Sequence, residues 1–303
     1  MSGVGVSGDS QSAGGRLTRF VFDRLPIRGG IVRLDGAWRS LLAGRPYPAP
    51  VRNLLGEALA AAPLLASGLK FEGRMSLQLE GSGPVGMLVV QVTHELEVRG
   101  MARHGEVEDE DGFARLVGRA GRLAVNLEPA RAGRRYQALV DLRGDSLAAS
   151  LEGYFQQSEQ IPTRLWLDAD GCAAVGLLLQ RLPDASVMAH QEDWRRVTQL
   201  AATLTPAELL GLPAERLLQR LFHEQTVRVF AQQPVEFVCR CMQGRISQML
   251  LALGRDEVED ILREQGRVEV ECGFCGRRVI YDRAGIAALF DGAEGEPPSE
   301  SVH

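Results

Sequence analysis

The strongest constraint in this sequence is a set of four cysteines near its C-terminal end, arranged as two close pairs. Cys239 and Cys241 form a CxC motif, and Cys272 and Cys275 form a CxxC motif after thirty intervening residues. A tetrahedral zinc ion takes four thiolates at about 2.3 Å, and two short-spaced pairs supply them once the chain between the pairs folds back. The spacing therefore predicts one Zn²⁺ per chain, bound by these four cysteines.

Residues beside the cysteines agree with this prediction. Gly273 and Gly276 allow the tight turn of a CxxC pair, which often needs a positive φ. We expect Arg240, Arg277 and Arg278 to offset the net negative charge of four thiolates on one Zn²⁺. Four protein sulfurs leave no open position for water or substrate, so catalysis at the metal is not expected.

Two roles for this site remain open on spacing alone. The first is a structural zinc site that stabilises a small domain with little hydrophobic core. The second is a redox switch, in which each pair closes on itself as a disulfide and withdraws its ligands from the zinc. Structural zinc contributes about 10–16 kcal/mol to the folding of zinc-finger peptides, so oxidation would unfold such a module. A thioredoxin-like role is disfavoured, because GRRVIYD after Cys275 has the pattern of a strand and not of a helix.

Composition sets the outer bounds. The chain has 303 residues, of which 45% are hydrophobic, enough for a sizeable core and for two domains or one domain with an appendage. The Gly/Ser-rich N-terminus lacks an apolar signal region, and the most apolar run, 54–69, is interrupted by Glu57 and Pro63. We therefore expect a cytoplasmic protein that spans no membrane, in a compartment where cysteines persist as thiols or metal ligands.

Residues 16–182 have the pattern of an α+β domain with an antiparallel sheet. Strand-like alternation predicts strands over 17–24, 28–35, 73–80, 86–98, 122–128, 136–142, 163–170 and 173–182. Helices are predicted over 49–69 and over 146–160, the latter with Ser146 as its N-cap. Cys172 precedes an apolar strand and is expected to be a buried thiol. Together these elements predict an N-terminal mixed α/β core.

From residue 184 to residue 232 the sequence becomes helical and leucine-rich. Thr205 is a candidate cap, and Pro206 and Pro213 fit first-turn positions of short helices. The apolar positions recur at helical spacing and include Leu200, Leu204, Leu217, Leu218, Leu221 and Phe222. The simpler interpretation is an amphipathic connector packed on the sheet, and the alternative is a concealed binding surface.

Several function classes lack support in the sequence. Gly81, Gly83 and Gly86 match GxGxxG by letter, but a strand follows them, so we expect a hairpin turn. No phosphate-binding GxxxxGK[ST] motif occurs. Residues 231–303 hold eight arginines, no lysine and thirteen acids, a net charge of −5 that argues against nucleic-acid binding.

The combination of motifs resembles the bacterial 33-kilodalton redox-regulated heat-shock chaperone family. The resemblance is carried by the two cysteine pairs, by YFQQSEQIPT at 154–163 and by GSGPVG at 81–86, and it covers about 16–290. It implies a core at 16–183, a metastable helical linker at 184–232 and a zinc-binding redox-switch domain at 233–290. Residues 1–15 and 291–303 are expected to be disordered tails.

The resemblance further implies an ATP-independent holdase, not an enzyme, that binds unfolding or oxidatively damaged proteins. In such a family member, oxidant forms the disulfides Cys239–Cys241 and Cys272–Cys275, zinc is released and the linker unfolds to expose a client surface. The oxidised form would dimerise, ATP-dependent foldases would receive the clients, and a thioredoxin-type reductant would reverse the switch. The alternatives are a non-switching structural zinc protein that acts as an interaction adaptor, and an enzyme in the N-terminal domain.

Overall fold

The computed structural model describes residues 14–131, 135–142, 145–183, 191–241 and 245–293. The chain divides into two compact units, Met1–Phe237 and Val238–His303, and each is described by itself. Apart from residues 14–15 and 291–293, the expected tails lie outside the described residues. Gly15 already belongs to the first strand, and residues 291–293 belong to the last helix.

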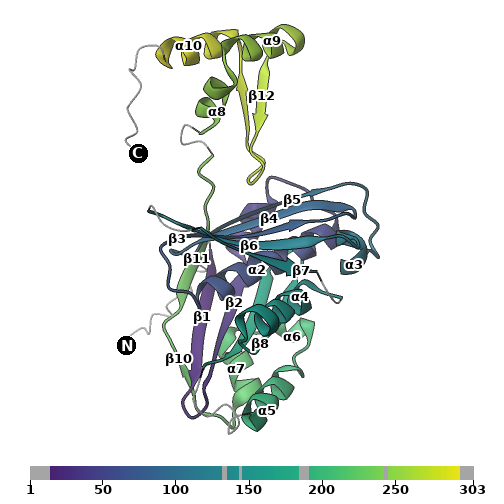
Figure 1. Ribbon diagram of the computed structural model, residues 1–303, viewed down its shortest axis with the longest axis vertical. Helices are drawn as coiled ribbons and strands as arrows, with labels where there is room; N and C mark the ends of the chain where they lie inside the picture. Colours follow the sequence, from purple (N-terminus) through teal and green to yellow (C-terminus); the bar gives the residue numbers. More distant parts are fainter. Residues whose placement is uncertain (1–13, 132–134, 143–144, 184–190, 242–244, 294–303) are drawn as a thin grey trace, which may run out of the picture. The chain divides into compact units, whose positions relative to one another are not determined.

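Eleven strands among the described residues form the sheet of the first unit (Figure 1). Their order is β7-β6-β3-β4-β5-β11-β1-β2-β9-β8, and β10 pairs with β1 beside β11. The strands are β1 (Gly15–Phe22), β2 (Ile27–Leu34), β3 (Gly73–Glu80), β4 (Val85–Thr93), β5 (Glu97–His104), β6 (Arg122–Pro129), β7 (Tyr136–Asp141), β8 (Thr163–Ala169), β9 (Ala174–Arg181), β10 (Val227–Val229) and β11 (Gln233–Phe237). Every pairing is antiparallel except β11 with β5, which confirms the α+β class.

One face of this sheet packs on the long helix α2 (Ala49–Ala66), which contacts β9, β4, β8 and β5. The helix is apolar around most of its circumference, as expected of a helix enclosed by other elements. Shorter helices α1 (Gly36–Leu42), α3 (Phe113–Val117) and α4 (Leu147–Tyr154) complete this layer, and a π-helical turn, η1 (Phe155–Glu159), continues α4. Ser146 caps α4 by accepting a hydrogen bond from the Ala149 N–H, as predicted. Within the described part of the chain, no helix has the length and apolar character needed to cross a membrane.

The opposite face of β1, β2 and β9 carries three short helices, α5 (Gln191–Ala201), α6 (Pro206–Gly211) and α7 (Ala214–Phe222). Side chains alternate along these strands, so Leu17 joins the α2 core whereas Phe20 and Phe22 join the cluster under α5–α7. We call this second cluster the linker core. It contains Phe20, Phe22, Ile27, Ile31, Ala173, Val175, Leu177, Leu179, Val197, Ala201, Leu204, Leu209, Leu217, Leu218, Leu221 and Phe222.

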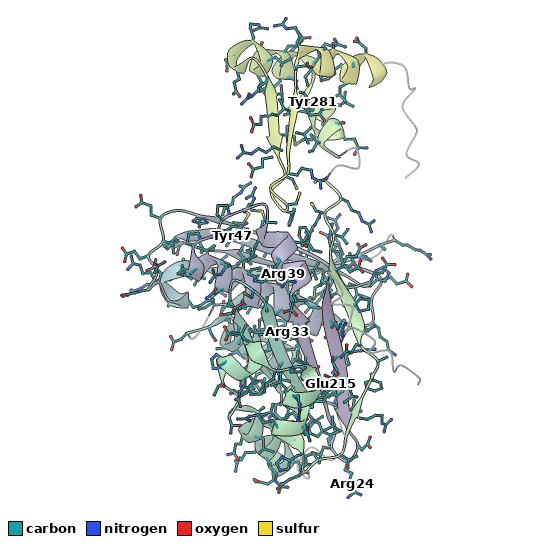
Figure 2. All side chains as sticks on the ribbon, turned by 180° about the vertical axis from the view of Figure 1, so that it is seen from behind. Arg24, Arg33, Arg39, Tyr47, Glu215 and Tyr281 are labelled. Carbon is teal, nitrogen blue, oxygen red and sulfur yellow. The ribbon has the colours of Figure 1, made fainter. Side chains whose placement is uncertain are left out.

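Polar contacts also attach the linker helices to the sheet. Thr205 caps α6 and Pro206 lies at its first position, as predicted, and Glu208 completes a reciprocal capping box that was not predicted. Pro213 is the N-cap of α7 and not a first-turn residue. Figure 2 shows Arg33, whose guanidinium on β2 donates to the Leu210 carbonyl of α6. The linker helices therefore lie on the sheet as the simpler interpretation predicted.

One predicted strand of the first unit and the start of the C-terminal module differ in the structure. The strand expected over 86–98 is two strands, β4 and β5, because the chain turns at Leu96, which adopts φ 63° without any glycine to indicate a turn. The C-terminal module, expected to start at residue 233, starts as a compact unit at Val238. Residues 233–237 form β11, which pairs with both β1 and β5 and so belongs to the first unit's sheet.

The second unit is small and has little core. It contains α8 (Arg245–Leu253), α9 (Arg255–Gln265), the hairpin of β12 (Val268–Glu271) and β13 (Arg278–Tyr281), and α10 (Arg283–Ala293). The helices α8 and α9 are separated at Gly254, which adopts φ 92°. Only six of the described residues form its buried cluster, namely Leu250, Val258, Leu262, Val268, Ile286 and Phe290. A domain of this size usually needs a metal or disulfides in addition to such a core.

Glu57 is an ionisable residue on the inward-facing helix α2, and it makes stability depend on pH. Burial, followed by the charge of Asp168, raises the pKa of Glu57 to about 8. A carboxyl with a raised folded-state pKa contributes stability that is fully present below its ordinary pKa of about 4.5 and is lost as pH rises through 8. Glu57 keeps some solvent contact, which reduces the effect. Between pH 5 and pH 8.5 we expect the free energy of unfolding of the parent to fall by about 2 kcal/mol more than that of Glu57→Gln. Urea unfolding at both pH values measures this difference, and parallel curves for the parent and the variant would contradict it.

Candidate metal centre

The second cysteine pair lies on the turn that joins β12 to β13. The Cys272 N–H donates to the Arg277 carbonyl at 2.9 Å, and the Gly276 N–H donates to the Cys272 carbonyl at 3.0 Å. Gly276 adopts φ 67°, the left-handed conformation that glycine takes at low cost, as its position in the motif indicated. This turn holds the two sulfurs within 4.8 Å of each other, and both cysteines are half-buried.

The first pair follows β11 and meets the second pair. The Cys239 and Cys272 sulfurs are 3.6 Å apart, and those of Cys241 and Cys275 are 3.4 Å apart. All four sulfurs lie within 4.8 Å of one another, and this is the one such group of potential ligands among the described residues. The structure therefore brings together all four cysteines that the sequence singled out.

The sulfur geometry fits a four-coordinate metal. A tetrahedron with metal–sulfur bonds of about 2.3 Å has sulfur–sulfur edges of about 3.8 Å. The separations of 3.4 to 4.8 Å agree with such edges and are too long for a disulfide, whose sulfurs are about 2.05 Å apart. Four thiolates and no oxygen donor suit Zn²⁺ better than a hard cation. Four sulfurs also complete the coordination, so the donor set is that of a structural site and not of a catalytic one.

The thiols differ in their acidity. Burial raises the pKa values of Cys239 and Cys241. Burial acts in the same direction on Cys272, but the backbone N–H groups of Cys275 and Phe274 and the neighbouring thiols outweigh it and lower the pKa of Cys272 to about 7. A bound divalent cation would stabilise all four sulfurs as thiolates.

The charges around the site agree only in part with the sequence analysis. Arg240 and Arg277 flank the sulfurs and are exposed to solvent. Arg278, which we expected to offset the thiolate charge, forms ion pairs with Glu271 at 3.1 Å and Glu269 at 3.5 Å on the neighbouring strand. Its charge is therefore compensated by carboxylates, because the hairpin register places Arg278 opposite Glu271.

The six residues named as a possible client surface are gathered in the linker core. Leu217, Leu221 and Phe222 are almost fully buried, Leu204 and Leu218 are buried, and Leu200 packs on the cluster from its edge. Phe222 contacts the rings of Phe22 at 5.1 Å and Phe20 at 6.3 Å between centroids. In this state of the protein, the leucine-rich face is covered by the sheet.

Cys172 was wrongly expected to be buried. It is exposed in the turn between β8 and β9, where its N–H donates to the Asp170 carboxylate at 2.7 Å. The apolar strand begins only at Ala174, so Cys172 lies in the turn before the buried part of the chain. The contact between Arg33 and Leu210 was missed altogether, because its partners lie 177 residues apart and no local pattern links them.

Comparisons with known proteins agree with this fold and this cysteine group. The family model described as Hsp33 protein matches residues 15–282. A 33 kDa chaperonin of Nitrosococcus oceani is 45% identical over 293 residues, covering 95% of this chain and 98% of that protein. A 33 kDa chaperonin of Azotobacter vinelandii is 46% identical over 292 residues, covering 94% and 97%.

The fold is also similar to a solved structure. The crystal structure of the 33 kDa chaperonin (heat shock protein 33 homolog) of Thermotoga maritima superposes with a TM-score of 0.78 at 26% identity, covering 93% of this chain and 99% of that one. A family match along most of the chain, relatives of matching length and a shared fold all agree with the four-cysteine group. The chain therefore belongs to the Hsp33 family of chaperones.

Proposed function

We propose that this protein is an ATP-independent holdase that disulfide formation at Cys239, Cys241, Cys272 and Cys275 switches on. The observation that carries the proposal is the convergence of the four sulfurs within 4.8 Å in a unit with six buried core residues among those described. One Zn²⁺ per chain would hold these sulfurs together as thiolates and supply folding free energy that so small a core lacks. The reduced protein would then be folded and inactive.

The oxidation step is a balanced two-electron exchange at each pair. A cysteine thiolate attacks hydrogen peroxide, the O–O bond breaks, and the sulfur becomes a sulfenic acid while hydroxide leaves and takes up a proton as water. The second thiol of the pair then attacks the sulfenic sulfur, the S–O bond breaks, and a second water departs as the disulfide forms. Each disulfide removes two of the four donors, so the site can no longer hold its ion.

Loss of the second unit would weaken the linker through the chain itself. Cys239 lies two residues after Phe237, the last residue of β11, so the strand loses its folded anchor when the second unit unfolds. The elements before it, β10 and α5–α7, are short and marginal without tertiary support, and they would open. The linker core would then be exposed, and burial of apolar surface, at about 25 cal/mol per Å², would bind unfolding proteins.

The same proposal names the partners. Clients are unfolding or oxidatively damaged proteins, which the oxidised protein would hold as a homodimer and pass to ATP-dependent foldases. A thioredoxin-type reductant would restore the four thiols and allow zinc to bind again. Exposed apolar linker surface favours the oxidised dimer, because two copies can cover part of it against each other.

The decisive experiment combines zinc release with client aggregation. Peroxide-treated protein should release one equivalent of zinc to a chromogenic chelator and suppress light scattering of a thermally unfolding client without nucleotide. Reduced protein should do neither. Retention of all zinc at full thiol oxidation would rule the switch out and leave the non-switching zinc adaptor as the better description.

The disulfides are expected to form within each motif, although the sulfurs that lie 3.6 and 3.4 Å apart in the folded unit belong to different motifs. Once the unit opens, within-motif thiols remain two or three residues apart, whereas the between-motif pairs are separated by 33 and 34 residues and pay a larger loop-closure entropy. Trypsin cleaves after Arg267 and Arg277, so peptide 268–277 should appear two hydrogens lighter, with its disulfide internal. Recovery of peptides from the two motifs joined to each other would contradict this pairing.

A further inference from the structure

The first unit contains a cavity of about 530 Å³ that lies apart from the cysteine group. It lies at the C-terminal end of α2 and is enclosed by strands from both halves of the sheet and by α4 with η1. Its inner wall is apolar and includes Leu64, Met75, Val125, Leu151 and Leu178, all of them buried. The volume is within the range of small-molecule sites, about 300–1,000 Å³.

Two arginines line the same cavity, and neither has a carboxylate partner among the described residues. Arg28 donates to the Gln180 side-chain oxygen at 3.0 Å and to the Gly68 carbonyl at 3.4 Å, both of them neutral acceptors. Arg19 is exposed beside it and lies 6.0 Å from the Phe230 ring centroid. Burial and then the charge of Arg19 lower the pKa of Arg28.

One carboxylate also lines the cavity, where it is hydrogen-bonded to two tyrosines. Glu159 accepts hydrogen bonds from the Tyr154 hydroxyl at 2.5 Å and the Tyr136 hydroxyl at 3.1 Å. Burial and these contacts raise the pKa of Tyr154, so its phenol remains a donor. The cavity thus combines apolar walls, one hydrogen-bonded carboxylate and two guanidinium groups, so positive charge exceeds negative charge by one among its lining side chains.

We propose that this cavity binds a fatty acid, with the alkyl chain among the aliphatic walls and the carboxylate on Arg28 and Arg19. Charge complementarity selects an anion, because a guanidinium pairs with a carboxylate through charge-assisted hydrogen bonds. The apolar walls select an alkyl chain. A polypeptide segment fits less well, since its backbone N–H and C=O groups would find few partners on walls of this composition.

Calorimetric titration of the reduced, full-length protein with octanoate, decanoate and dodecanoate tests the site. Each methylene buried should tighten binding roughly fourfold. Dodecanol should bind at least about tenfold more weakly than dodecanoate, and dodecyltrimethylammonium should not bind measurably. Equal affinities for the acid and the alcohol, or no dependence on chain length, would overturn the proposal.

Variants locate the binding. Leu127→Trp fills part of the cavity and should abolish binding, whereas Leu139→Trp, at an exposed leucine outside it, should not. The double variant Arg19→Gln/Arg28→Gln should weaken the binding of dodecanoate at least about tenfold and leave the affinity for dodecanol unchanged. Arg24→Gln, in the turn between β1 and β2 (Figure 2) and outside the cavity, is the matched control for the arginines.

The proposal is independent of the redox switch, so the two can fail separately. If the parent does not bind dodecanoate but Leu127→Trp lowers the aggregation suppression of the oxidised protein, the cavity belongs to clients and the fatty-acid proposal is wrong. The chain-length and headgroup series uses the parent protein alone, so it supports or overturns the proposal even if a variant does not fold.

Discussion

Chelation of the metal from the reduced protein should unfold residues 245–293 while α2 and the sheet that it packs on stay folded. The six-residue cluster of the second unit cannot offset the conformational entropy of its helices and hairpin, whereas structural zinc contributes about 10–16 kcal/mol in zinc-finger peptides. Hydrogen exchange followed by mass spectrometry should show the amides of α9 and α10 losing protection by about a thousandfold or more, with α2 and β9 unchanged.

A matched pair of cysteine variants separates the metal from general thiol effects. Replacement of Cys239, Cys241, Cys272 and Cys275 by serine should leave the backbone amides of the second unit unprotected from hydrogen exchange, with or without added zinc. Cys172→Ser changes an exposed thiol in a turn of the first unit and should behave as the parent. If the quadruple variant keeps the protection of α9 and α10, the metal does not hold this unit together.

Phe222→Ala should be the most damaging single substitution in the linker core. The ring is 2% exposed and packs on Phe20 and Phe22, so its loss leaves a cavity between α7 and the sheet and should cost about 4 kcal/mol. Because the linker helices are short, this cost should appear as local opening of α5–α7 and as partial client binding by the reduced protein. Hydrogen exchange of 191–222 and client light scattering measure the two effects.

Leu139→Ala is the control for this substitution. Leu139 lies on β7 and is 64% exposed, so its truncation should change stability by less than about 0.5 kcal/mol. If Phe222→Ala loosens α5–α7 while the reduced protein still ignores clients, the linker core is a structural layer and not the concealed binding surface.

The sequence predicted features that depend on local pattern or on ligand chemistry. The four cysteines were identified because their spacing has few other uses, and the caps at Ser146 and Thr205 follow from side chains that reach only three residues along the chain. The long helix 49–69 and most strands were identified for the same reason. Periodicity of apolar residues is a local property, and it survives in the folded protein.

Features that depend on distant partners could not be predicted. The turn at Leu96 takes a left-handed conformation without glycine, so only the pairing of β4 with β5 reveals it. The cavity that holds Arg28 draws its walls from both halves of the sheet, and no stretch of sequence indicates it. Arg278 was assigned to the thiolates on proximity in sequence, but cross-strand register gave it to Glu271.

The position of β11 has a consequence for how a client would be held. The strand follows the linker in sequence, yet it is inserted between β5 and β1 in the first unit's sheet, while β9 precedes the linker. If β11 keeps its place while α5–α7 detach, the released segment remains attached to the sheet at both of its ends, through β9 and β11. A captured protein would then be confined close to the sheet face that α5–α7 had covered. After reduction, redocking of α5–α7 would be an intramolecular step whose rate does not depend on protein concentration.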